Sequence, residues 1–166
     1  MRSGAGPAAQ SSAATLRAID PSSVEATRIE AELAAAMKAW PQALGRFGAL
    51  QLVAPNDGAA RAGAGQALLG LNRPADAIAQ YRGCAEVSPW QAECQLGLGI
   101  ALRESDQAEQ ALIPLADAAR LDGLDPRIPF ETARTLRGLL RRDEAIIHSA
   151  RASELAQQLE QRLTLP

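Results

Sequence analysis

The sequence predicts an all-α chain built from repeated helical hairpins, and three observations support this prediction. Hydrophobic residues make up 47% of the chain, with alanine and leucine dominant and aromatic residues only 3%, which favours closely packed helices over sheets. Small residues recur with a constant period. Prolines recur with the same period at Pro21, Pro55 and Pro89, where one unit ends and the next helix starts in a new direction.

The period is clearest at a row of alanines. These are Ala43, Ala77, Ala111 and Ala145, each 34 positions after the last. Twelve positions before each alanine lies another small residue, at Ala31, Gly65, Gly99 and Ala133. Small side chains at both points allow the two helices of a hairpin to approach closely. Residues that would fill the space between successive hairpins lie four and ten positions after the alanines: Phe47, Tyr81, Leu115 and Ser149, then Val53, Val87, Leu121 and Leu155.

Taken in order, the elements are one lone helix and four hairpins. Residues 8–19 form a helix that caps the N-terminal end, where an apolar hairpin face would otherwise be exposed. The hairpins pair residues 24–37 with 41–53, 58–71 with 75–87, 92–104 with 108–121, and 129–140 with 143–163. The last helix carries Leu155, Leu159 and Leu163 on one stripe, which covers the final repeat or, alternatively, forms a dimer seam.

These elements predict the domain organisation. A flexible start and a capping helix occupy residues 1–23, and the end of the C-terminal capping helix occupies residues 158–166. Four repeats lie between them, at 24–57, 58–91, 92–125 and 126–157. Pro114 lies inside a predicted helix, where it removes a backbone donor at a cost of about 3 kcal/mol in a straight helix. We therefore expect a kink or a late helix start at Pro114.

Together these spacings resemble the tetratricopeptide repeat, whose pattern has small, small, aromatic and proline residues at these positions. The resemblance covers about residues 24 to 157 and is strongest from Gly58 to Pro89. It implies a superhelix of about four helical hairpins with an N-terminal and a C-terminal capping helix.

A narrower resemblance rests on two segments. Residues 96–99 read Leu-Gly-Leu-Gly, and residues 125–130 read Asp-Pro-Arg-Ile-Pro-Phe. At this separation they look like the class II chaperones of type III secretion systems, small cytosolic proteins that bind membrane-inserting translocator proteins. The resemblance implies a chaperone that holds an extended hydrophobic segment of a secreted client in a concave groove. The alternative is a generic tetratricopeptide-repeat scaffold that assembles a multiprotein complex and uses a convex or end surface.

The predicted partner-binding residues follow from the stacking of hairpins, because the first helices of such a stack line its concave face. The stripes on these helices contain Leu69, Leu96, Ile100, Arg103, Arg127, Phe130, Arg134 and Arg137. An apolar middle with an arginine-rich end suits an extended peptide with hydrophobic anchors and acidic or carbonyl groups. Simple packing is the alternative for Phe130, and a solvated face is the alternative for the arginines.

Other function classes find little support in the sequence. Seventeen Lys and Arg residues and nineteen Asp and Glu residues are spread along the chain, so no basic stripe marks a nucleic-acid surface. We see no secretory signal or membrane span, and we expect a cytoplasmic protein, with a homodimer left open. His148 is the only histidine and has no triad partners nearby. Cys84 and Cys94, as buried thiols or as a single bridge, lack the spacing of a zinc pair. We therefore expect no enzyme, cofactor or metal.

Overall fold

The computed structural model describes residues 5–164, and every regular element within this range is an α-helix. The helices are α1 (Ala5–Ile19), α2 (Val24–Ala36), α3 (Trp40–Val53), α4 (Gly58–Gly70), α5 (Pro74–Val87), α6 (Ala92–Glu104), α7 (Ala108–Leu121), α8 (Arg127–Gly138) and α9 (Arg142–Thr164). The predicted all-α fold class is confirmed, and each predicted hairpin helix begins and ends within two residues of the observed one. The predicted flexible start falls partly on residues 1–4, which lie outside the described residues.

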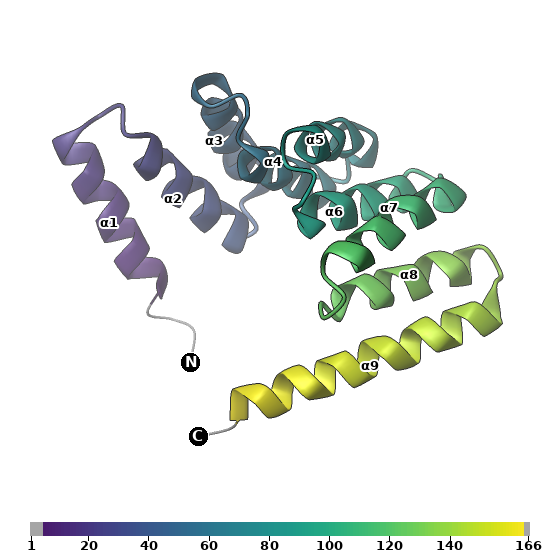
Figure 1. Cartoon of the computed structure of the whole chain (residues 1–166). Coiled ribbons are helices and arrows are strands. Elements are labelled where there is room, and N and C mark those ends of the chain that lie inside the picture. The colour runs from purple at the N-terminus through teal and green to yellow at the C-terminus, as the bar shows by residue number, and fades with distance from the viewer. Residues whose placement is uncertain (1–4, 165–166) are drawn as a thin grey trace. The chain divides into compact units, whose positions relative to one another are not determined.

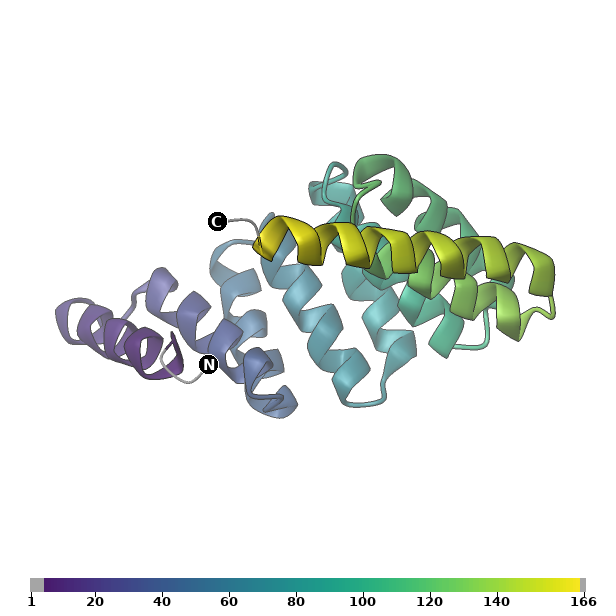
Figure 2. The same ribbon diagram turned by 90° about the horizontal axis from the view of Figure 1, so that it is seen from below.

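The described helices form two compact units, which are divided between Val87 and Ser88. In the first unit α1 packs on α2, and the hairpins α2–α3 and α4–α5 follow (Figure 1). In the second unit the hairpins are α6–α7 and α8–α9. Figure 2 shows that α9, with 23 residues, runs beyond the end of α8, which has 12. The division of the chain into four repeats with the predicted bounds stays a prediction.

The turn inside each hairpin has the same geometry four times. One residue per turn has a positive φ, and these residues are 34 positions apart: Lys38, Asn72, Asp106 and Leu140. In each case the next residue donates its backbone N–H to the carbonyl five positions earlier, as Arg73 does to Leu68 at 2.9 Å and Arg141 to Leu136 at 2.9 Å. This is the Schellman arrangement that ends a helix on a left-handed residue. The period in the sequence is therefore also a period in the backbone.

The packing of the core of the first unit requires a glycine at position 63. Phe47 on α3 is 5% exposed, and its ring occupies the space that a Cβ at Gly63 on α4 would need. The small residues Ala31, Ala43, Ala60 and Ala64 surround it in one buried cluster. An ion pair between Arg17 Nε and Glu30 Oε1, at 3.1 Å, links α1 to α2. The N-terminal helix therefore packs on α2 of the first hairpin, and its capping role stays a prediction.

The core of the second unit joins its two hairpins. Leu96 on α6, Leu115 and Ala118 on α7, and Ile128 on α8 form one cluster, and each is at most 2% exposed. Burial of such aliphatic side chains stabilises the fold by about 1.5–3 kcal/mol each. Ile128 therefore holds the last hairpin against the one before it.

Pro114 lies within α7, which runs without a break from Ala108 to Leu121. The expected late helix start is wrong, and the expected kink stays a prediction. The proline ring is buried, so the packing of the ring offsets part of the cost of the missing backbone hydrogen bond.

Candidate functional site

The structure places seven of the eight predicted partner-binding residues in the second unit. Leu96, Ile100 and Arg103 lie on α6, and the remaining four lie on α8: Arg127, Phe130, Arg134 and Arg137. Leu69 lies half-buried on α4 in the first unit. The predicted residues therefore do not form one continuous site within a single unit.

The two aliphatic residues on α6 serve packing. Leu96 is 2% exposed because it belongs to the cluster that Ile128 of α8 completes, and Ile100 packs against the same cluster. The expectation that Leu96 presents its side chain to a ligand is therefore wrong in this structure. The next hairpin therefore covers Leu96, while Ile100 stays half-buried.

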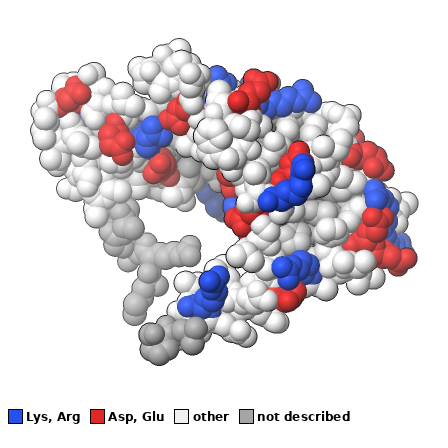
Figure 3. Space-filling view, viewed as in Figure 1, with Lys and Arg blue, Asp and Glu red and all other residues white. Residues whose placement is uncertain are grey.

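Three of the four predicted arginines are engaged within the second unit, and Arg127 has two partners. It pairs with Glu93 on α6 and with Asp125, at 2.7 Å in both cases. Burial alone would raise the pKa of Asp125, but the hydrogen bonds from the Arg127 side chain and backbone hold it below its usual range. Figure 3 shows acidic and basic side chains next to one another on the face in view, which agrees with such pairing.

Glu131 on α8 connects two further predicted arginines. Its carboxylate lies 3.0 Å from Arg103 on α6 and 3.1 Å from Arg134, one helical turn away. The Arg134 guanidinium also lies over the ring of Phe130, 5.9 Å from its centroid, in cation–π geometry. Arg137 has no ion pair among the residues that the structure describes.

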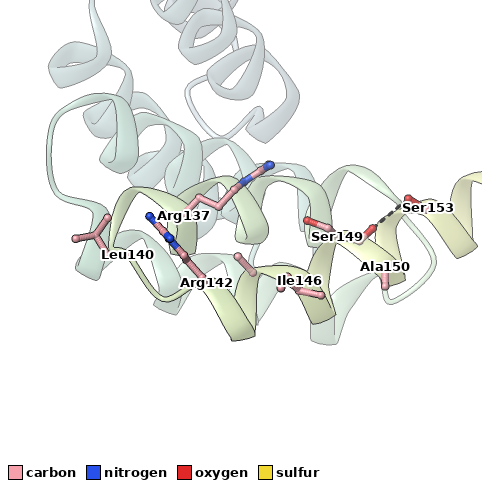
Figure 4. A pocket seen from close by; sticks show the side chains of 8 residues that line it. Arg137, Leu140, Arg142, Ile146, Ser149, Ala150 and Ser153 are labelled. Carbon is pink, nitrogen blue, oxygen red and sulfur yellow. Dashed lines mark hydrogen bonds between the residues drawn. The ribbon is translucent and has the colours of Figure 1, made fainter.

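Two neighbouring hollows lie on the α8–α9 hairpin, and together we call them the end groove. Its larger hollow has a volume of about 710 Å³ and is lined by Arg137, Leu140, Arg142, Ala145, Ile146, Ser149, Ala150 and Ser153. Figure 4 shows that Arg137 comes from α8 and that Ile146, Ser149, Ala150 and Ser153 follow one another along α9. A smaller hollow of about 320 Å³ is lined by Pro126, Arg127, Phe130, Ala152, Ser153 and Ala156. Ser153 borders both hollows.

The end groove exposes large apolar side chains beside small ones. Phe130 is 49% exposed, Ile146 is 66% exposed and Leu140 is 77% exposed. Leu140 also has a φ of 62°, a left-handed conformation that costs a leucine about 1–2 kcal/mol. Exposed apolar side chains around a hollow that is also lined by serine and alanine are typical of a surface that binds another protein.

Phe130 and Arg137 were predicted from the sequence as binding residues, whereas Leu140 and Ile146 were missed. The 34-residue repeat of the sequence does contain a signal for the end groove. Ser149 occupies the position that Phe47, Tyr81 and Leu115 occupy in the earlier hairpins. A small polar residue at a position that is otherwise bulky and buried marks a space that this hairpin leaves unfilled.

Two further findings concern the described residues alone. Within residues 5–164 no three His, Cys, Asp or Glu side chains come together as a metal site would require. In the same range no helix combines the length and the apolar character needed to cross a membrane.

Comparison with known proteins gives matches in structure alone. No protein-family model and no curated protein sequence matches the chain. The solved structure of MamA has a TM-score of 0.79 and 15% identity, covering 95% of this chain and 92% of that one. TTC0263, a thermophilic tetratricopeptide-repeat protein of Thermus thermophilus, has a TM-score of 0.80 and 22% identity, covering 96% and 88%. YrrB, a tetratricopeptide-repeat protein described as having an unusual peptide-binding site, has a TM-score of 0.71 and 16% identity, covering 90% and 77%.

These matches extend over at least 90% of the chain and agree with its all-helical fold. They confirm the predicted likeness to tetratricopeptide-repeat proteins, and none of these three is described as a type III secretion chaperone. At this level of identity they concern the fold. The chain has the tetratricopeptide-repeat fold.

Proposed function

We propose that this protein is an interaction scaffold that binds a segment of a partner protein in the end groove of its second unit. The observation that carries the proposal is the exposure of Leu140 and Ile146 around a hollow of about 710 Å³, and of Phe130 at the neighbouring hollow of about 320 Å³. Burying such side chains against a partner gains about 25 cal/mol for each Å² of apolar surface removed from water. The proposed function is binding without chemistry, in the cytoplasm.

The fold supports this proposal by analogy. Stacked helical hairpins present extended surfaces for other proteins, and YrrB, which shares the fold, is described as having a peptide-binding site. In this chain Ile128 of α8 covers Leu96 on α6, whereas the α8–α9 hairpin has a hollow lined by exposed apolar side chains. The end groove therefore suits a partner better than the predicted stripe on α6.

The narrower proposal, a chaperone for secreted translocator proteins, rests on the segments 96–99 and 125–130. Both segments have packing roles in this structure. Gly99 leaves room for Leu115, Ile128 fills the core, and Asp125 binds Arg127. Because packing accounts for these residues, the segments add little evidence for a particular client. We therefore favour the general scaffold and keep the translocator chaperone as its more specific form.

A capture experiment with a matched control tests the proposal. The full chain would be immobilised and exposed to an extract of its source cells, alongside the variants Ile146→Asp and Ile147→Asp. Both isoleucines lie on α9 with similar exposure, 66% and 68%, but only Ile146 lines the groove. We expect a specific partner to be retained by the native chain and by Ile147→Asp and to be lost with Ile146→Asp.

Retention of every partner by Ile146→Asp would refute binding in the end groove. The identity of the retained protein then separates the two forms of the proposal. A secreted, membrane-inserting protein supports the translocator chaperone, and a soluble component of an assembly supports the general scaffold. Circular dichroism of each variant checks that both remain folded.

A further inference from the structure

The last two hairpins present equivalent surfaces because they are related by one period of the repeat. The third hairpin, α6–α7, uses one side to hold the fourth. The fourth hairpin, α8–α9, has the corresponding side open. The residues on that side correspond as Leu96 to Phe130, Arg103 to Arg137, Leu115 to Ser149 and Ala118 to Ala152.

The third hairpin shows what such a surface binds. Its Leu96 and Leu115 are 2% and 1% exposed because Ile128, at the start of helix α8, completes their cluster. Three positions after Ile128, Glu131 pairs with Arg103 at 3.0 Å, and these side chains are only 12% and 15% exposed. The bound element is therefore a helix with an apolar side chain followed, one turn later, by an acid.

The fourth hairpin repeats this surface with two differences. Phe130 is 49% exposed where Leu96 is buried, and Ser149 stands where Leu115 fills the space. The exchange of leucine for serine enlarges the hollow, so it fits a side chain larger than the isoleucine that the third hairpin binds. An aromatic or other bulky apolar residue therefore fits the end groove.

The charges on the rim indicate the second feature of the occupant. Arg137 stands at the position of Arg103, which has its acidic partner on the next hairpin. Arg137 and Arg142 both line the hollow, and neither has an ion pair among the residues that the structure describes. Two unpaired guanidinium groups beside an apolar hollow favour a partner with carboxylates at its edge.

We infer that the end groove binds an amphipathic helix of a partner protein, which lies on α8–α9 as α8 lies on α6–α7. The helix carries a bulky apolar residue that enters the space over Ser149 and an acidic residue three positions later that pairs with Arg137. This inference rests on the proposed function and specifies the chemistry of the partner. A second copy of the chain that stacked through α1 would lack this acid, since α1 contains no Asp or Glu.

A peptide assay tests the inference directly. The probe is a fluorescent peptide of residues 124–141, which includes α8, with Ile128→Phe to enlarge the apolar residue and with Glu131 retained. Its binding to the full chain would be followed by fluorescence anisotropy. We expect Arg137→Glu in the protein to weaken binding at least about fivefold, whereas the control Arg162→Glu, an exposed arginine outside the groove, leaves it unchanged.

Charge exchange and size exchange make the assay specific. The Glu131→Arg form of the probe should bind weakly to the native chain and should recover binding to Arg137→Glu. The probe with Phe at 128 should bind the native chain more tightly than the probe with Ile, and Ser149→Leu in the protein should reverse this order, because it recreates the smaller space of the third hairpin.

The outcomes separate the inference from the proposed function. The inference of an acidic helix is overturned if the probe does not bind, or if neither Arg137→Glu in the protein nor Glu131→Arg in the probe changes its binding. This holds even if Ile146→Asp still abolishes capture of a natural partner, which would leave the proposed function standing. If Ile146→Asp abolishes neither probe binding nor partner capture, the inference and the proposed function are both overturned. Concentration-dependent dimers that block the probe and disappear with Ile146→Asp also overturn the inference, since a second copy is then the occupant.

Discussion

Gly65 in the first unit and Gly99 in the second occupy equivalent positions of the period but make room for different side chains. A Cβ at position 65 would lie 2.7 Å from Cε2 of Tyr81, and a Cβ at position 99 would lie 2.6 Å from Cγ of Leu115. Both side chains are buried, at 3% and 1% exposure. The space that glycine leaves at this position is therefore filled by an aromatic ring in the first unit and by a branched aliphatic side chain in the second.

This difference shows which part of the repeat is fixed. In these two hairpins the close approach of the helices depends on the glycine, where the first and fourth hairpins have the small residues Ala31 and Ala133, whereas the side chain that fills the neighbouring space varies in shape. The ring of Tyr81 is one large rigid plane, whereas the two methyl groups of Leu115 can reorient by a change of χ2. The two units are therefore expected to tolerate the same substitutions to different degrees.

The largest expected effect comes from removing the side chains that fill these spaces. Tyr81→Ala should lower the free energy of unfolding by about 3–5 kcal/mol and Leu115→Ala by about 2–5 kcal/mol, because each leaves a cavity among buried neighbours. Guanidinium chloride unfolding followed by circular dichroism measures both values. As a control, Leu52→Ala, at a side chain 86% exposed, should change stability by less than about 0.5 kcal/mol. Losses near about 1 kcal/mol at Tyr81 and Leu115 would show that neighbours collapse into the space.

A smaller effect is expected from adding a methyl group to the glycines. Gly65→Ala and Gly99→Ala should each lower the free energy of unfolding by about 1–3 kcal/mol, since the added Cβ overpacks the interface. The loss should be greater at Gly65, whose neighbour is a rigid ring. Gly48→Ala is the control, because nothing lies within 4 Å of its Cβ, and it should gain up to about 1 kcal/mol from helix propensity. A greater loss at Gly99 would indicate that the Ala111 carbonyl, 3.3 Å away, limits the packing instead.

The helices and turns could be predicted from the sequence because the period determines them locally. The spacing of Ala43, Ala77 and their equivalents located eight hairpin helices to within two residues. Of the kink or late helix start expected at Pro114, the late start was wrong, since local propensity does not include the burial of the proline ring. The fold was therefore predictable wherever neighbours along the chain decide the structure.

The candidate site was predicted less well, because accessibility depends on what packs over a helix. Leu96 and Phe130 lie at equivalent positions of the repeat, so the sequence predicted both as partner-binding residues. Ile128 covers Leu96, however, and no described residue fills the corresponding place beside Phe130. Leu140 and Ile146 were missed for the same reason, since their exposure follows from the lack of a further hairpin over α9 in the described chain.

The two units also differ in how they hold an equivalent aspartate, and pH tests this difference. Asp57, at the N-cap of α4, accepts a hydrogen bond from Arg28 at 2.7 Å, and Asp125, two periods later in the chain, binds Arg127. Burial alone would raise the pKa of each carboxyl, but these bonds hold both below the usual range. The stabilisation is therefore complete above about pH 4, the unfolded value, and is lost as the pH falls through the lower folded pKa.

The exposure of the partner arginines predicts which of the two aspartates contributes more to the free energy of unfolding. Arg28 is 29% exposed and Arg127 is 61% exposed, so solvent screens the second pair more. Asp57→Asn should cost about 1 kcal/mol at pH 7 and Asp125→Asn less, and asparagine preserves the capping of α4. Both differences from the native chain should shrink as the pH is lowered toward 2. A cost that is independent of pH would assign the effect to lost hydrogen bonds and not to charge.

The smallest expected effect concerns the left-handed turn residue, which is Asn72 in the first unit and Leu140 in the second. Their φ angles are 57° and 62°, and asparagine tolerates this conformation better than leucine. Leu140→Asn should therefore raise the free energy of unfolding by about 0.5–1 kcal/mol, and Asn72→Leu should lower it by a similar amount. Thermal unfolding of the two variants and of the double exchange measures both. Since Leu140 lines the end groove, Leu140→Asn should also weaken binding of a partner, whereas Asn72→Leu should not. Opposite changes in stability and binding at Leu140 would show that the strained leucine is retained for binding, and a loss of stability would show that its side chain supports the hairpin instead.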